Sequence, residues 1–230
     1  METVPEKVFQ GCTSLTEAVV SEGVKELDDA VFWGCSALKK VTLPSTLEKA
    51  GFGCFYDCKA LDEIYAADIA SWLKIDFTSP VLDVNFLEKK LHIGGKLLTK
   101  AVIPEGIETI PAFAFHDCKS LTSVKLPKSI TDIGESAFQG CDGLTEIQLP
   151  EGLTTIGKNA FSGVYHLSEV KLPSSLTRLG ERAFYSIWDL TAIDIPGSVT
   201  VIGQSAFAHC GKLANITLHK GLQVIEPHAF

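Results

Sequence analysis

The sequence predicts a repeat solenoid, in which short coils stack on one another and place a parallel β-sheet along one face. Phenylalanine recurs with a period of 23 residues, each period holds a short stretch of alternating apolar residues, and proline often follows that stretch. A unit of this length cannot bury its own apolar face, but stacked units bury a continuous one. We expect short turns or helical pieces on the opposite face and one irregular long repeat, in a β-rich α+β fold.

The phenylalanine column defines the repeat and its boundaries. Nine of the 13 phenylalanines share one register: Phe9, Phe32, Phe55, Phe115, Phe138, Phe161, Phe184, Phe207 and Phe230. Every gap is 23 residues except that from Phe55 to Phe115, which is 60 residues, or one period plus an insertion of 37. We therefore expect a single solenoid over residues 1–230, with an insertion at about 67–103. Because the chain begins and ends within the motif and shows no polar cap, we expect a fragment of a longer array.

Further columns predict how each coil is built. Leucine stands six positions after the phenylalanine, a β-branched residue nine positions after it in all but one repeat, and an apolar residue eleven positions after it, as in Leu121, Val124 and Leu126. Alternation with period two is typical of a half-buried strand, and a proline such as Pro127 ends the strand because it lacks an N–H. Glycines late in the unit, such as Gly157, are expected to permit tight turns.

The clearest copies of the repeat, Leu121–Cys141 and Leu144–Phe161, follow the pattern L-x-x-[VI]-x-L-P-x-x-[LI]-x-x-I-G-x-x-A-F-x-x-C. This pattern resembles the BspA-like leucine-rich repeat, and the resemblance extends over essentially the whole chain. It implies the leucine-rich repeat fold. It also implies a cell-surface or secreted protein, because the members are mostly such proteins of host-associated bacteria and of some protozoa. Adhesion to host proteins is the activity usually implied.

The inserted segment resembles an irregular long unit seen in bacterial members of that family. It contains Trp72, Phe77 and Phe86, and the pair Gly94-Gly95 between apolar alternations predicts a two-residue hairpin turn. Its apolar content indicates that most of it packs against the solenoid. The alternative, that it is a recognition element added to the fold, stays open at this point.

Six of the seven cysteines share the column three positions after the phenylalanine. They are Cys12, Cys35, Cys58, Cys118, Cys141 and Cys210. The other two repeats carry Val164 and Ile187 there, which indicates a site for a small buried apolar side chain. We expect free buried thiols, although adjacent coils would bring them within a separation that a disulfide tolerates. The seventh, Cys54, takes the place of the alanine before the phenylalanine, and no second pair at zinc spacing supports a metal site.

Composition and motifs exclude several classes of function. The apolar content of 46% with 21% charged residues argues against disorder, and the net charge of −8 argues against nucleic-acid binding. No stretch is long and apolar enough to insert into a membrane. No G-x-S-x-G motif or phosphate loop is present and the histidines fall in different columns, so we expect neither an enzyme nor a cofactor. We expect a monomer.

Candidate binding residues lie on two surfaces. The outward strand positions form a strip of mixed charge that includes Lys125, Lys171 and a single aromatic residue, Tyr65. Four positions after the phenylalanine, a polar column becomes aromatic in two successive repeats, at Tyr165 and Trp188, and Tyr185 lies in the same turn region. Stacking would place Tyr165 and Trp188 on neighbouring coils as an aromatic ledge for a partner or glycan, with Tyr185 nearby. The alternatives are a solvated sheet face, and rings that only repack the altered cysteine column.

These patterns favour a non-catalytic interaction module of a cell-surface or secreted protein, which binds host or extracellular proteins or glycans as an adhesin does. One alternative is a structural spacer in a multidomain surface protein. The remaining alternative is an accessory segment of an enzyme whose catalytic domain lies outside these residues.

Overall fold

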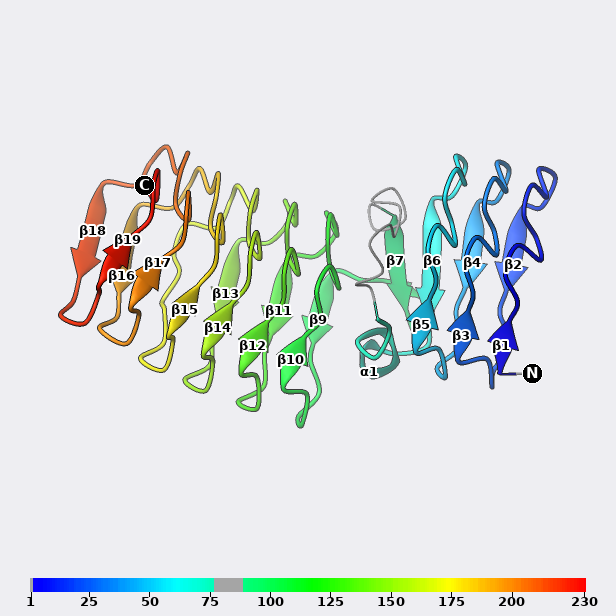
Figure 1. The fold of residues 1–230 in the computed structure, drawn as a ribbon, viewed down its shortest axis with the longest axis horizontal. Helices are drawn as coiled ribbons and strands as arrows, with labels where there is room; N and C mark the ends of the chain where they lie inside the picture. Colours follow the sequence, from blue (N-terminus) through cyan, green and yellow to red (C-terminus); the bar gives the residue numbers. More distant parts are fainter. Residues whose placement is uncertain (1, 77–88) are drawn as a thin grey trace. The chain divides into compact units, whose positions relative to one another are not determined.

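The computed structural model describes residues 2–76 and 89–230, whose coils are stacked as in a β-solenoid and paired mainly through parallel sheets (Figure 1). The predicted fold class is confirmed. The chain divides into two compact units, Met1–Leu98 and Thr99–Phe230, each built from stacked coils. Whether one solenoid extends over residues 1–230 stays a prediction.

The first unit contains two sheets and a short helix. Its elements are β1 (Thr3–Val4), β2 (Glu17–Val19), β3 (Glu26–Leu27), β4 (Lys40–Thr42), β5 (Lys49–Ala50), β6 (Glu63–Ala66), α1 (Ile69–Trp72), β7 (Lys90–Ile93) and β8 (Lys96–Leu97). The sheets have the strand orders β2-β4-β6-β7-β8 and β1-β3-β5. Neighbouring coils pair one period apart, as Glu17 with Lys40, and every pair is parallel except β7 with β8.

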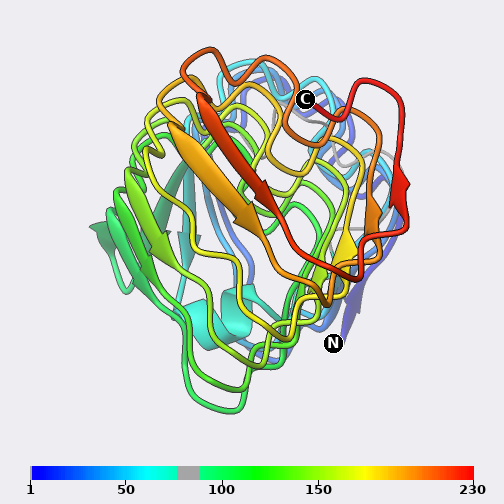
Figure 2. The same cartoon turned by 90° about the vertical axis from the view of Figure 1, so that its left-hand side faces the viewer.

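The second unit repeats this arrangement. Its strands are β9 (Lys100–Val102), β10 (Thr109–Ile110), β11 (Ser123–Lys125), β12 (Asp132–Ile133), β13 (Glu146–Gln148), β14 (Thr155–Ile156), β15 (Arg178–Leu179), β16 (Ala192–Ile195), β17 (Val201–Ile202), β18 (Asn215–Leu218) and β19 (Val224–Ile225). The two-residue strands form one continuous sheet, β10-β12-β14-β15-β17-β19, whereas the longer strands form two sheets, β13-β11-β9 and β16-β18. Figure 2 shows the coils of this unit end-on.

Stacked phenylalanine rings form the core of each unit. In the second unit, the rings of Phe138 and Phe161 lie 5.3 Å apart between centroids with planes 7° apart, and the other neighbours repeat this geometry. The first unit stacks Phe9, Phe32 and Phe55 in the same way. The rings of the inner coils are buried. The phenylalanine column is therefore a continuous aromatic stack inside each unit, because each coil places its ring on the next one.

A second set of strands, which the sequence analysis did not predict, lies opposite the longer ones. Each strand holds two residues and, except for β19 at the end of the chain, closes on a buried aliphatic side chain, as Thr155–Ile156 does. Parallel pairing repeats here as well, with Ile156 opposite Leu179. A strand of two residues is too short to show the alternation of apolar and polar residues that predicts longer strands. The only sign of it in the sequence is the Ile, Leu or Val near the end of each repeat.

Two positions in every coil adopt the left-handed backbone conformation. They lie two residues before and two residues after each column phenylalanine from Phe9 to Phe207, as at Asn159 and Gly163 around Phe161. Gly157 and Gly180, which were expected to permit turns, are not among these positions. A Cβ added at Gly180 would instead lie 2.6 Å from the carbonyl carbon of Gly157. These glycines are therefore needed because adjacent coils approach closely, and the expected role in turns was wrong.

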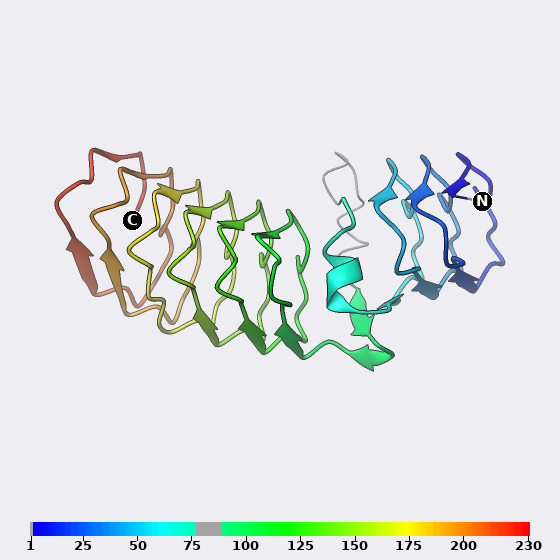
Figure 3. The same ribbon diagram turned by 90° about the horizontal axis from the view of Figure 1, so that it is seen from below.

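The described part of the insertion forms an irregular coil that extends both sheets of the first unit. Figure 3 shows α1 within this coil. Strand β7 pairs with β6 in parallel, and Asp76 bridges to Lys49 beside β5. The side chains of Trp72 and Ile75 are buried. The predicted hairpin is confirmed, since Gly94 and Gly95 both have positive φ and join the antiparallel strands β7 and β8. Phe77 and Phe86 lie outside the described residues.

Candidate functional site

The aromatic ledge lies on the turn edge of the second unit. Trp188 is 60% exposed and Tyr165 is 42% exposed. They belong to neighbouring coils, which are joined here by a hydrogen bond from the N–H of Asp189 to the carbonyl oxygen of Tyr165 at 3.1 Å. The ring of Trp188 extends over the next coil, because a Cβ at Gly211 would lie 4.0 Å from its Cε3 atom. Side chains of this kind on neighbouring coils form an exposed surface of the sort that partners bind.

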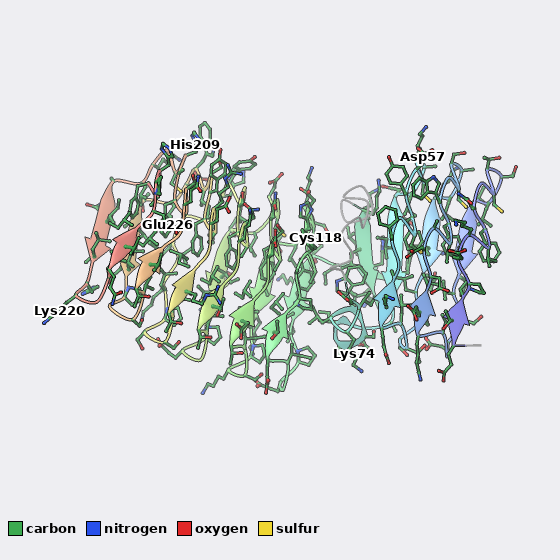
Figure 4. All side chains as sticks on the ribbon, viewed as in Figure 1. Asp57, Lys74, Cys118, His209, Lys220 and Glu226 are labelled. Atoms are coloured by element: carbon green, nitrogen blue, oxygen red, sulfur yellow. The ribbon has the colours of Figure 1, made fainter. Side chains whose placement is uncertain are left out.

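Tyr185 adds to this surface but is half-buried. Its ring meets the exposed ring of His209 edge-on, with centroids 5.1 Å apart, and the guanidinium carbon of Arg182 lies 5.5 Å from its centroid. Figure 4 labels His209 at the edge where the turns of this unit lie. The sequence analysis did not single out His209 or Arg182. Arg182 stands three positions before Tyr185 in the same turn, and His209 lies in the turn of the next coil. These two spacings were the signal that the sequence offered. The aromatic ledge is formed by Tyr165 and Trp188, and Tyr185 and His209 extend it.

A charged cluster flanks the ledge. The carboxylate of Asp189 contacts Nδ1 of His166 at 3.0 Å and Nζ of Lys212 at 2.6 Å. The hydrogen bonds from Lys212 and then from His166 lower the pKa of Asp189 below its ordinary value. This cluster spans three coils and leaves the carboxylate ionised beside Trp188.

The three sheet-face candidates do not come together with the ledge. Tyr65 lies in the first unit, between Nζ of Lys40, 4.7 Å from its ring centroid, and the stacked ring of His92 at 4.3 Å. Lys125 is exposed on β11. Lys171 is exposed and lines a groove of about 650 Å³ on the sheet side of the second unit.

A second aromatic cluster, in the first unit, escaped the sequence analysis. The rings of Trp33 and Tyr56 lie 4.4 Å apart between centroids, and Phe52 lies 6.4 Å from Trp33. Phe52 and Tyr56 are exposed. Trp33 and Tyr56 each follow a column phenylalanine directly, as Tyr185 does, so the column offered a signal for this cluster.

The cysteine column contains free thiols, as predicted. Five of the seven thiols are buried and Cys210 is half-buried. Cys12, in the first coil, is exposed, so the expectation that the whole column is buried was wrong for this residue. Within residues 2–76 and 89–230, no three His, Cys, Asp or Glu side chains are placed to hold a metal ion. No helix in this part of the chain could cross a membrane.

The fold of this chain is similar to that of several solved bacterial proteins. The chain resembles a leucine-rich repeat protein from Bacteroides ovatus (24% identity, TM-score 0.60, 99% of this chain and 67% of the other). It also resembles one from Eubacterium ventriosum (18%, 0.55, 99% and 87%) and the pneumococcal vaccine antigen PcpA (16%, 0.55, 99% and 66%). At these identities the likeness shows the fold. No curated protein matches significantly.

The family comparison covers most of the chain. Six copies of the BspA type leucine-rich repeat region match over residues 1–76, 94–199 and 132–230. Leucine-rich repeat proteins are in general non-catalytic interaction modules, and members of this family are typically bacterial surface or secreted proteins. With its phenylalanine, leucine and cysteine columns placed in stacked coils, this chain belongs to the BspA type leucine-rich repeat family.

Proposed function

We propose that this chain is the interaction module of a cell-surface or secreted protein, and that it binds an extracellular protein or glycan of a host through the aromatic ledge. The observation that carries the proposal is the exposure of Trp188 and Tyr165 in inner coils of the second unit. Most large apolar side chains of those coils are buried. Exposed tryptophan and tyrosine side chains are the commonest anchors of protein interfaces, and flat rings also stack on sugars.

The surroundings of the ledge support this role. Tyr185 and His209 extend it across a further coil, and Arg182 places a cation beside Tyr185. The Asp189 cluster adds hydrogen-bonding groups at its rim. An aromatic centre with a polar rim is the arrangement common to protein interfaces. A structural spacer needs no such surface.

The test is a binding screen with matched variants. Wild-type protein is screened against extracellular-matrix proteins and a glycan array, and any ligand found is titrated against Trp188→Ala with Tyr165→Ala. Because both side chains are exposed, we expect unchanged thermal unfolding and affinity weaker by about tenfold or more. Val102→Ala removes an equally exposed apolar side chain from the sheet face of the same unit and should leave affinity unchanged.

The screen also separates the alternatives. Binding that survives the double substitution would exclude the ledge as the site. A chain that binds nothing in the screen would instead fit a spacer. Antibody labelling of intact cells of the source organism tests the location, since a surface protein is labelled without permeabilising the cells.

A further inference from the structure

Two columns of the repeat change together in three successive coils of the second unit. They are the fourth and fifth places after each column phenylalanine, and in these coils they read Tyr165-His166, Trp188-Asp189 and Gly211-Lys212. In the five earlier coils the fifth place holds only serine, alanine or glycine. The two exposed rings of the aromatic ledge therefore lie beside a line of long polar side chains that the other coils lack.

The rings of the ledge keep faces that a ligand can cover. The ring of Trp188 lies over Gly211, and the hydroxyl oxygen of Tyr165 lies 3.8 Å from the place that a Cβ at Gly163 would take. Because both neighbours are glycines, no side chain at those two positions covers the rings. Within the described residues neither ring packs on another aromatic ring, whereas the rings of the cluster in the first unit pack on one another.

The polar line beside the rings is suited to hydroxyl groups. The carboxylate of Asp189 accepts from Nζ of Lys212 at 2.6 Å and contacts Nδ1 of His166 at 3.0 Å. A carboxylate has about four lone-pair sites and an ammonium group has three N–H donors, so both groups can still bind a ligand. A sugar hydroxyl donates and accepts hydrogen bonds, and adjacent hydroxyls of one sugar can therefore pair with Asp189 and Lys212 together.

The spacing of the coils favours a chain of sugars over a polypeptide. Ring centroids of successive coils lie 5.2 Å apart from Phe161 to Phe184 and 5.4 Å apart from Phe184 to Phe207. An extended β-1,4-linked oligosaccharide advances by nearly this distance per sugar unit, so it would present about one sugar to each coil. An extended polypeptide advances by about 3.3 Å per residue and does not match the coils.

We propose that the aromatic ledge binds an extended β-linked oligosaccharide that lies along the stacking axis of the coils. Sugars of this chain stack on the rings of Tyr165 and Trp188, and their hydroxyls pair with Asp189 and Lys212. The inference rests on the proposed function, in which the ledge is the binding surface, and it narrows the ligand to one chemical class.

The first test compares oligosaccharides by calorimetry. The extended probes are cellohexaose and chitohexaose, β-1,4-linked hexamers of glucose and of N-acetylglucosamine. Isomaltohexaose is the matched control, because its α-1,6 links make a hexamer of glucose that does not extend in this way. We expect at least one extended hexamer to bind about tenfold or more tightly than isomaltohexaose and than its own disaccharide. If neither hexamer does so, the proposal is overturned.

The second test places the bound hexamer on the protein. Trp188→Ala with Tyr165→Ala should weaken its binding by about tenfold or more, and Val102→Ala should leave it unchanged. A sugar stacked on Trp188 should also shift the tryptophan fluorescence to shorter wavelengths, and Trp188→Phe should abolish the shift. Hexamer binding that survives the double substitution, or a shift that persists in Trp188→Phe, would overturn the proposal.

The third test extends the ledge by one coil. Asp142 holds the place before Tyr165 in the same column and is half-buried. Asp142→Tyr would add a ring for a further sugar, so the hexamer should bind about threefold or more tightly. Gln148→Tyr adds a ring at an exposed site of the same coil, on the sheet face, and should leave the affinity unchanged. An equal gain in both variants, or no gain in either, would overturn the proposed direction of the chain.

These outcomes separate the inference from the proposed function. A protein ligand that loses affinity in the double variant, while neither hexamer binds, would leave the ledge as the binding surface and overturn the oligosaccharide. A hexamer that binds the double variant as it binds the wild type would overturn both.

Discussion

The thiol of Cys141 donates a hydrogen bond over 3.0 Å to the main-chain carbonyl oxygen of Phe115, which belongs to the preceding coil. The same bond joins Cys58 to Phe32 at 3.1 Å and Cys210 to Phe184 at 3.2 Å. Where the column holds Cys35, Cys58, Cys141 or Cys210, its thiol therefore links the coil to the phenylalanine of the coil before it. A buried carbonyl oxygen has two lone pairs, and the thiol satisfies one that apolar surroundings would leave without a donor.

The aromatic stack should dominate the stability of the inner coils. Phe161→Ala removes a fully buried ring between two stacked neighbours, and we expect it to lower the free energy of unfolding by about 3–5 kcal/mol. Phe9→Ala removes a ring of the same column that is 40% exposed, and it should cost clearly less. Urea unfolding of both variants checks this, and equal losses would contradict a stack stabilised by burial.

Alkaline pH should destabilise the fold through the buried thiols. Burial raises the pKa of Cys118 from 9.0 to about 11. Between about pH 9 and pH 11 the unfolded chain therefore releases a proton that the folded chain keeps, and stability falls as the pH rises. Cys118→Val removes this site, so the variant should lose about 1 kcal/mol less than wild type between about pH 8 and pH 10.

Urea midpoints at the two pH values measure that effect. Val164 occupies the same column, so Val164→Cys is the reverse substitution and should make the decline with pH steeper. An identical pH dependence in the wild type and both variants would exclude the thiols as the cause.

The glycines between coils should not tolerate a methyl group. In Gly180→Ala the new Cβ would lie 2.6–2.8 Å from main-chain atoms of Gly157 and Lys158, which cannot move aside as a side chain can. We expect a loss of about 1–3 kcal/mol from overpacking, measured as a lower thermal midpoint. Gly211→Ala is the matched control, since its Cβ would meet only Trp188 at 4.0 Å. Equal midpoints for the two variants would contradict the close approach.

A glycine in the left-handed column should stabilise the protein. Ser186 has φ of 57°, and the same position holds Gly34, Gly140 and Gly163 in other coils. Ser186→Gly removes the steric cost of this conformation for a residue with a Cβ, and we expect a gain of about 0.5–1 kcal/mol. Thr200→Gly is a control at an exposed position outside the left-handed region, where glycine should destabilise. Unfolding free energies of the two variants should therefore shift in opposite directions.

Repetition explains why so much of the fold could be predicted. Each column is sampled once per coil, so the buried character of the Phe161 and Cys141 positions is evident without any structure. The parallel pairing follows from the period, and the Gly94-Gly95 turn follows from local chemistry. The ledge residues Tyr165 and Trp188 were also visible, because they depart from a polar column.

The sequence by itself determined the period, the stacked core and the exposed aromatic positions, since each is a property of one residue type in one register. Only the tertiary structure decided how adjacent coils meet. It brought Gly180 against the main chain of Gly157, aimed the thiol of Cys141 at Phe115, and divided the longer strands of the second unit between two sheets. The reason is physical. Contacts between coils depend on differences of a few tenths of an ångström in distance, and no residue type encodes such differences by itself.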